Sequence, residues 1–322
     1  MSKRDFIFDM ETGDPDDFLT LALLAGHPDI NLKAVTVTPG TPHQIGIVRW
    51  GLKQFGLDEI PVGAYDLGHK KARGTSEERY VTCVSQWHYD TFGAIEPSSE
   101  AEPGWQVLSK NLHANTTLVT GAPLKNLGKL LDRMALMLFD QHPNLGRLFI
   151  QGGFAGDDVV PAENVLTKFR GKTTCPTYNL NGDPRSAEAV LKSRFFHRPT
   201  PGNEYIFDHD IRLVSKNVCH GVVYDLDLHE RLKAVPDPHP GLALVIQAMT
   251  GYLDRRPSGK AFHDPLAAMC ALDRDIGTWA EVEPYRERGA AGPQWGCRAQ
   301  EGSGIRIITR YDQERFISAM TE

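Results

Sequence analysis

The chain has 322 residues, of which 41% are hydrophobic and 24% are charged, and its formal net charge is -6. This length can bury a large core, and because no flexible linker interrupts the sequence we expect a single domain over residues 1–322. The acidic balance argues against a nucleic-acid partner, which would usually require a basic stripe. No apolar run is long enough for a signal peptide or a membrane span, so we expect a cytoplasmic protein without a membrane partner.

Five cysteines are scattered along the chain, and no two of them have the C-x-x-C spacing of a metal or redox motif. An odd number of widely separated cysteines predicts neither a disulfide framework nor a zinc site. This pattern also fits a reducing compartment.

Apolar runs alternate with segments of helical periodicity. Strands are predicted at residues 6–8, 32–38, 61–64, 117–120, 147–150 and 211–214, and helices at 44–55, 124–138, 186–192 and from residue 18 onward. The repeated β-α-β order implies a single-domain α/β fold with an open, mostly parallel, Rossmann-related central sheet and helices on both faces. The loops at the carboxyl ends of the strands would then share one rim.

Five carboxylates follow the first predicted strand within nine residues, namely Asp9, Glu11, Asp14, Asp16 and Asp17. Neighbouring carboxylates repel one another, so their joint ionisation favours a bound cation. They would lie at the carboxyl end of a strand, where open α/β sheets bind ligands. The alternative is that Asp14 or Asp16 caps the following helix, but capping explains only one or two of the acids.

Two later segments carry further polar residues beside predicted helix starts. His263 and Asp264 precede a proline suited to a first helical turn, and simple capping by Asp264 is the structural alternative. Asp183 is predicted to cap the helix that Pro184 begins. Asn179, a few residues upstream of that cap, is freer to bind a ligand.

Taken in order, these segments resemble the nucleoside hydrolases, the inosine-uridine-preferring N-ribohydrolase family. The anchors are the acidic motif, residues 121–127, the Gly152-Gly153-Phe154 segment, residues 179–184 and residues 263–265. Residues 121–127 are similar to the family's Gly-Pro-Leu-Thr-Asn turn. The resemblance covers residues 6 to about 268. It implies hydrolysis of a ribonucleoside to free base and ribose in purine or pyrimidine salvage, by a homo-oligomer.

The resemblance also implies a set of oxygen ligands for Ca²⁺. Asp17 corresponds to a bidentate ligand, Asp264 to a second carboxylate, and Glu11 stands where the family has an aspartate. The main-chain carbonyl of Lys125 occupies the position of a carbonyl ligand. Ca²⁺ accepts such irregular, all-oxygen sites. Asp14 could replace Glu11 as a ligand or cap the helix, and the sequence leaves both possibilities open.

Catalytic and supporting roles follow from the same resemblance. Asp16 corresponds to the general base that takes a proton from the attacking water, and Asp9 to an acid that supports the site from the strand end. Asn179 is similar to a residue that contacts the ribose, and Thr41 falls where the family has another ribose contact. His263 resembles the histidine beside the leaving base, where it could donate a proton.

The position of Thr177 raises the question of a 5′ substituent. Thr177 stands where the family often has a glutamate that binds the ribose 5′-hydroxyl, and the segment upstream carries Lys168, Arg170 and Lys172. Together they suggest a 5′-phosphate or another 5′ group on the substrate. The simpler alternative is a solvated basic loop.

Asn217 and His220 resemble the region where the family places base-contacting residues. The more ordinary expectation for Asn217 is that it caps a helix.

Two other classes of protein remain open. Asp9, Glu11 and Thr12 also resemble the Asp-x-Asp-x-Thr nucleophile loop of haloacid-dehalogenase-type phosphatases, although this leaves Asp16 and Asp264 unexplained. The other alternative is a nucleoside- or sugar-binding protein without catalytic activity, which the departures at Glu11 and Thr177 suggest.

Overall fold

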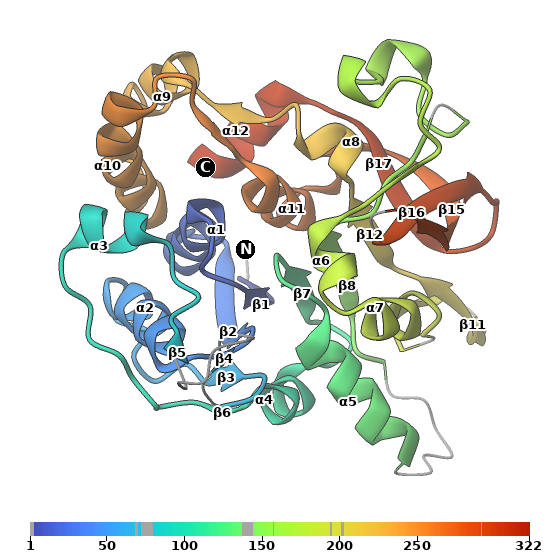
Figure 1. The fold of residues 1–322 in the computed structure, drawn as a ribbon, viewed down its shortest axis with the longest axis horizontal. Helices are drawn as coiled ribbons and strands as arrows, with labels where there is room; N and C mark the ends of the chain where they lie inside the picture. The colour runs from blue at the N-terminus through green and yellow to red at the C-terminus, as the bar shows by residue number, and fades with distance from the viewer. Residues whose placement is uncertain are drawn as a thin grey trace.

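The computed structural model describes residues 3–67, 70–71, 80–136, 144–156, 158–193, 195–200, 203–290 and 292–322. An 11-stranded sheet runs through the molecule (Figure 1). In spatial order its strands are β6 (Glu102–Pro103), β3 (Val62–Ala64), β2 (Ile30–Val37), β1 (Arg4–Met10), β7 (Thr117–Thr120), β8 (Arg147–Gln151), β12 (Ile211–Val214), β17 (Ile305–Tyr311), β15 (Gly277–Gly289), β16 (Gly292–Ala299) and β9 (Thr174–Cys175).

Neighbouring strands from β6 to β17 pair in parallel, whereas β15, β16 and β9 extend the sheet in antiparallel fashion. Further short pairs are β4 (Lys70–Lys71) with β5 (Tyr80–Val81), β10 (His197–Thr200) with β11 (Asn203–His209), and β13 (Val223–Tyr224) with β14 (Lys260–Ala261). The predicted α/β fold with a mostly parallel sheet is therefore confirmed.

Helices cover both faces of the sheet (Figure 1). They are α1 (Pro15–Gly26), α2 (Pro42–Lys53), α3 (Gln86–Phe92), α4 (Gly104–Asn111), α5 (Lys125–Leu136), α6 (Tyr178–Gly182), α7 (Pro184–Leu191), α8 (Lys216–Cys219), α9 (Leu226–Lys233), α10 (Pro240–Arg255), α11 (His263–Leu272) and α12 (Gln313–Thr321). In the described part of the chain, none of them is long and apolar enough to cross a membrane.

The alternation of side chains along β1 explains these two layers. Phe6, Phe8 and Met10 belong to a buried cluster with α1, α2, α10, α11 and α12, whereas Ile7 belongs to a second cluster with α4, α5 and α7. Successive side chains of a strand point to opposite faces, so a strand covered on both faces must be apolar throughout. The apolar run that predicted β1 is thus a consequence of its central position.

Most predicted elements lie within a few residues of the observed ones. The helix predicted at 44–55 is α2, which starts two residues earlier at Pro42, and the last residues of the helix predicted at 124–138 fall outside the described residues. Asp183 accepts a hydrogen bond from the Ser186 amide at 3.1 Å, which confirms it as the cap of α7. All five cysteines are described, and none of them forms a disulfide.

Candidate active site

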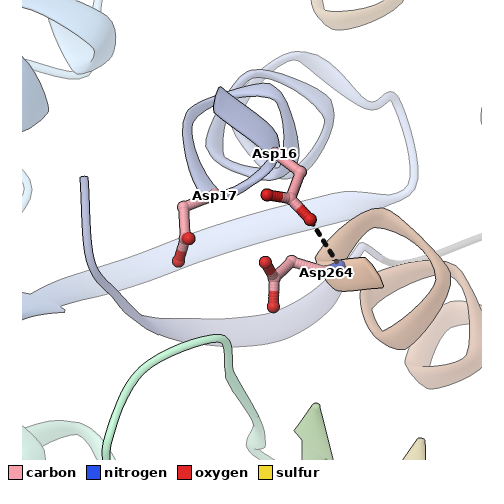
Figure 2. Close-up of side chains that lie close together, drawn as sticks. All are labelled: Asp16, Asp17 and Asp264. Atoms are coloured by element: carbon pink, nitrogen blue, oxygen red, sulfur yellow. Dashed lines mark hydrogen bonds between the residues drawn. The ribbon is translucent and has the colours of Figure 1, made fainter. Parts of the chain in front are cut away.

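Three carboxylates from two distant parts of the chain meet at the rim where β1 and β7 end. Asp16 and Asp17 come from the first turn of α1, and Asp264 comes from the first turn of α11 (Figure 2). An oxygen of each lies within 4.8 Å of an oxygen of each of the others. All three side chains are buried, so water does little to screen their mutual repulsion.

This crowding disfavours ionisation in the absence of a cation. Burial, followed by the charges of Asp264, Glu11 and Asp16, raises the pKa of Asp17 well above its ordinary value. Burial and then Asp16 do the same to the pKa of Asp264. A bound cation removes this cost, and a set of carboxylate oxygens suits a hard ion.

The surroundings of Asp17 and Asp264 fit a bound ion. Asp264 Oδ1 is buried and accepts no hydrogen bond from any described residue. Gly121 passes so close that a Cβ added there would lie 2.6 Å from Asp264 Oδ1 and 2.8 Å from Asp17 Oδ1. Any larger residue at position 121 would intrude on these oxygens. The Glu11 amide donates to Asp17 Oδ1 at 3.0 Å.

Asp16 is held by α11 rather than by its own helix. Its Oδ2 accepts hydrogen bonds from the amides of His263 at 3.1 Å and Asp264 at 3.5 Å, and its Oδ1 lies 3.1 Å from Lys260 Nζ. The capping alternative for Asp264 is wrong, because Asp264 lies inside the helix after Phe262, which occupies the cap position. The first amides of α11 are instead satisfied by Asp16.

Asp14 stands at the cap position of α1, but its side chain makes no capping hydrogen bond. Its Oδ1 instead forms an ion pair with Lys260 Nζ at 2.7 Å. The side chains of Asp14 and Asp16 therefore do not cap α1, which was the alternative explanation for these two acids. Lys260 was missed in the sequence, where a single lysine between a glycine and an alanine carries no signal.

Asp9 lies behind the acidic cluster and is fully buried. Its Oδ1 accepts hydrogen bonds from Thr36 Oγ1 at 2.6 Å and from Asn126 Nδ2 at 2.9 Å. Burial raises the Asp9 pKa to about 6 despite these two hydrogen bonds. A side chain so enclosed cannot attack a phosphate ester from the cavity, which argues against the phosphatase alternative.

Asn179 is fixed in a way that leaves one of its polar atoms available. Its Nδ2 donates to the carbonyl oxygen of Gly121 at 3.0 Å, and to the carbonyl oxygen and Oε1 of Gln151 at 3.0 and 2.7 Å. Its Oδ1 is buried and accepts no hydrogen bond from the described residues. An acceptor held this way at the wall of a cavity is suited to a ligand hydroxyl. Gln151 was also missed by sequence reasoning.

Two histidines, which line the same cavity as Asn179, stack on each other. The rings of His220 and His263 have centroids 4.7 Å apart and an interplanar angle of 24°. Burial and the neighbouring His263 lower the pKa of His220 to about 3, while burial and Lys260 lower the pKa of His263 to about 4. Both rings are therefore neutral at neutral pH, and Lys168 Nζ donates to His220 Nδ1 at 2.9 Å.

Thr41 and Asn217 are engaged in local structure. The Thr41 hydroxyl accepts from the Gln44 amide as the cap of α2 and donates to the Thr82 carbonyl. The prediction that Asn217 caps a helix is wrong: Ser215 occupies the cap position of α8, and Asn217 Oδ1 accepts from the Ser215 hydroxyl at 2.5 Å.

Two adjoining cavities open at this rim. One of about 440 Å³ is lined by the acids of the cluster together with Asn179, His220 and His263. The other, of about 880 Å³, includes Lys125. Thr177 and Lys216 line both cavities. Together the cavities are large enough for a nucleoside.

A buried cluster of carboxylates beside a ligand-sized cavity, at the strand ends of an open α/β sheet, is an arrangement typical of metal-dependent α/β enzymes. The family model "Inosine-uridine preferring nucleoside hydrolase" matches residues 6–318, and the chain belongs to this family. The protein is thus a hydrolase of the N-glycosidic bond of ribonucleosides, as the sequence predicted. Family membership rejects the phosphatase alternative.

Individual relatives are distant in sequence. The chain is 24% identical to the pyrimidine-specific ribonucleoside hydrolase RihA of Shewanella baltica over an alignment 315 residues long, and the match covers 88% of this chain and 84% of that protein. Among solved structures, the plant nucleoside hydrolase PpNRh1 has a TM-score of 0.64 at 18% identity and covers 99% of this chain and 98% of its own. An inosine-guanosine nucleoside hydrolase has a TM-score of 0.65 at 16% identity, and the match covers 98% of this chain and 97% of that structure. At such identities these structures support the fold.

Proposed function

We propose that the chain hydrolyses a ribonucleoside at a Ca²⁺ centre held by Asp17, Asp264, Glu11 and the main-chain carbonyl of Lys125. The approach of Asp16, Asp17 and Asp264 oxygens to within 4.8 Å carries this proposal, because buried acids so close together call for a cation. When bound, the ion supplies Lewis acidity toward an attacking water and an anchor for ribose hydroxyls.

Glu11 is the better of the two open candidates for a further ligand. Both residues line the cavity, but Asp14 Oδ1 is already paired with Lys260 at 2.7 Å, whereas the charge of Glu11 acts on Asp17. An aspartate committed to an ammonium would have to give up that ion pair to bind the ion. We therefore assign ligation to Glu11 and leave Asp14 to Lys260.

The other residues then have distinct tasks. Asp16 takes the proton of the attacking water, and the α11 amides hold its carboxylate in place. Asn179 Oδ1 accepts a hydrogen bond from a ribose hydroxyl. His263 and the stacked His220 flank the leaving base, where a neutral imidazole can donate one N–H. Asp9 supports the site from behind through Asn126.

A 5′-substituted nucleoside is a second candidate substrate. The buried Thr177 hydroxyl has no hydrogen-bond partner in the described chain, and Lys216 brings a cation to the wall that both cavities share. The cavity of about 880 Å³ offers room for a substituent there. Glu11 and Asp66 on the same wall oppose a phosphate, so an unmodified nucleoside remains the first candidate.

One assay tests reaction class, metal and substrate together. The protein is incubated with a panel of nucleosides, their 5′-monophosphates and NAD, with and without a chelator, while free base and reducing sugar are measured. We expect release of base and sugar that the chelator stops and Ca²⁺ restores. Release of phosphate alone, or turnover that resists the chelator, contradicts the proposal. A clear preference for the unmodified nucleoside removes the 5′-phosphate candidate.

We further propose a cytoplasmic salvage enzyme that forms a homo-oligomer from single domains spanning residues 1–322. Light scattering coupled to gel filtration tests the oligomeric state, with a monomer as the contrary result. Fractionation of the native cells tests the location.

A further inference from the structure

Lys260 is a buried cation inside the acidic cluster. Its side chain is only 7% exposed, and Nζ lies 2.7 Å from Asp14 Oδ1 and 3.1 Å from Asp16 Oδ1. Nζ also donates a hydrogen bond to the Ala261 carbonyl at 2.8 Å. Lysine is almost never fully buried unless it is paired, so this ammonium depends on the two aspartates.

The charge of Lys260 is retained despite burial. Burial alone would lower the pKa of Lys260, but Asp16 and Asp14 more than offset this and raise the pKa above its ordinary value. The lysine is therefore a permanent positive charge beside the proposed catalytic base.

This charge is distributed unevenly over the acids. Within the described part of the chain, Lys260 pairs with Asp14 and Asp16, whereas Asp17 and Asp264 have no ion pair with a lysine or arginine. Asp17 Oδ1 accepts only the Glu11 amide, and Asp264 Oδ1 accepts no hydrogen bond from these residues. The cluster thus contains one pair of acids that shares a single cation of the protein, and another pair that has no such partner in the described chain.

We propose that Lys260 is a positioning residue that divides the acidic cluster, reserving Asp16 for proton transfer and leaving Asp17 and Asp264 to bind the cation. The inference rests on the proposed function, in which Asp16 is the base. A free carboxylate beside a divalent ion binds it, and a bound carboxylate is a poorer base. Lys260 on Oδ1 and the two α11 amides on Oδ2 keep Asp16 out of coordination, while Oδ1 retains a lone pair for a water.

Substitution of Lys260 separates this role from simple support of the fold. In Lys260→Met, Asp16 loses its counter-charge and is free to turn toward the ion. We expect kcat to fall about 100-fold at saturating Ca²⁺, within the range of lost base catalysis. Removal of a nearby positive charge also leaves Ca²⁺ affinity unchanged or tightens it, by up to about tenfold. Isothermal titration of the metal-free protein measures affinity independently of activity.

Two further variants complete the experiment. Lys260→Arg keeps the charge and should retain kcat and affinity within about threefold, since a cavity of about 490 Å³ lined by Asp14, Trp87 and Lys260 gives room for the longer side chain. Lys233→Met is the matched control, because Lys233 is an exposed lysine paired with Glu230 on α9. It should change neither quantity.

Two outcomes overturn the proposal: an unchanged kcat in Lys260→Met, or a parallel loss of kcat, Ca²⁺ affinity and melting temperature that arginine does not rescue. If Lys260→Met does not fold, Lys260→Gln carries the same test with a neutral donor. If the parent hydrolyses no nucleoside, the proposed function fails. The Ca²⁺ titrations of parent and variants still test whether Lys260 leaves Asp17 and Asp264 to bind the cation.

Discussion

The carboxylate of Asp16 accepts hydrogen bonds from the backbone amides of His263 and Asp264, although 247 residues separate Asp16 from His263. Asp16, the proposed base in α1, thereby caps α11, which supplies the proposed metal ligand Asp264. Both α1 and α11 point their N-termini at the cluster, which favours negative charge there. The site is therefore assembled only when α1, near the start of the chain, packs beside α11, near its end.

Replacement of Asp16 tests its role as the base. In Asp16→Asn the side-chain oxygen can still accept the amides of α11, but the amide group cannot take a proton from water. We expect kcat to fall about 1000-fold, while KM changes little. Steady-state kinetics at saturating Ca²⁺ give both constants. Ca²⁺ affinity within about threefold of the parent is the control, and a kcat within tenfold of the parent contradicts the assignment.

Replacement of the proposed ligands tests the metal centre. Asp264→Asn removes a charge from a site that needs net negative charge, so we expect Ca²⁺ affinity to fall by two orders of magnitude or more. The parent should also melt at a higher temperature when Ca²⁺ is added, because the ion binds the folded state. This shift should shrink in Asp264→Asn. The exposed Asp227→Asn on α9 is the control, and an unchanged shift in Asp264→Asn contradicts the site.

The N-terminal part of the acidic cluster could be predicted because its signal is local, whereas Asp264 was assigned to it only through the family resemblance. Asp9, Glu11, Asp14, Asp16 and Asp17 stand together in sequence after an apolar run, and a strand buried on both faces requires such a run. The parallel strands at the centre of the sheet were predicted for the same reason. Their continuous apolar character follows directly from coverage by helices on both sides.

The antiparallel extension carries a weaker signal. β15 is 13 residues long, but much of it is half-buried or exposed, and charged residues follow one another along it without a clean alternation. Tertiary pairing with β17 and β16 fixes this strand, and the sequence does not display that pairing. Lys260 was missed for a related reason: its partners Asp14 and Asp16 are remote in sequence.

Capping residues are predicted least reliably where two good caps lie close together. Ser215 and Asn217 are both common at the start of a helix, and the choice between them depends on how the chain leaves β12. The hydroxyl of Ser215 donates to Asn217 Oδ1 and to the Ile308 carbonyl of the neighbouring strand β17. That second contact comes from the sheet and is invisible to a local pattern.

Asn179 allows a test of the ribose subsite. Asn179 lines the cavity, and because its Nδ2 is anchored on Gly121 and Gln151, its buried Oδ1 is left without a donor in the described chain. Asn179→Ala removes an acceptor for a ribose hydroxyl, and we expect kcat/KM to fall about 5- to 150-fold, since a buried substrate hydroxyl left without its partner costs roughly 1–3 kcal/mol. Kinetics with a ribonucleoside measure the loss. Unchanged Ca²⁺ affinity is the control, and a loss confined to metal binding contradicts a ribose contact.

The buried His27 ring should make the stability of the folded protein depend on pH, independently of the active site. Its Nε2 donates to the Ala319 carbonyl at 3.1 Å and its Nδ1 accepts from the Asp29 amide at 3.1 Å, which requires a neutral ring. Burial, and then the neighbouring His239, lower the His27 pKa to about 4. An unfolded histidine titrates near 6.5, so between these values the unfolded chain binds more protons than the folded one.

The contribution of His27 is therefore complete above pH 6.5 and is lost as the pH falls toward 4. We expect the melting temperature of His27→Gln to lie below that of the parent at pH 8, because the variant loses contacts with α12 and with Asp29. This difference should shrink between pH 6.5 and 5, where the parent loses stability through His27 and the variant does not. Thermal unfolding followed by circular dichroism at constant Ca²⁺ measures both proteins. A difference that stays constant from pH 8 to 5 means that the ring does not gain its proton on unfolding.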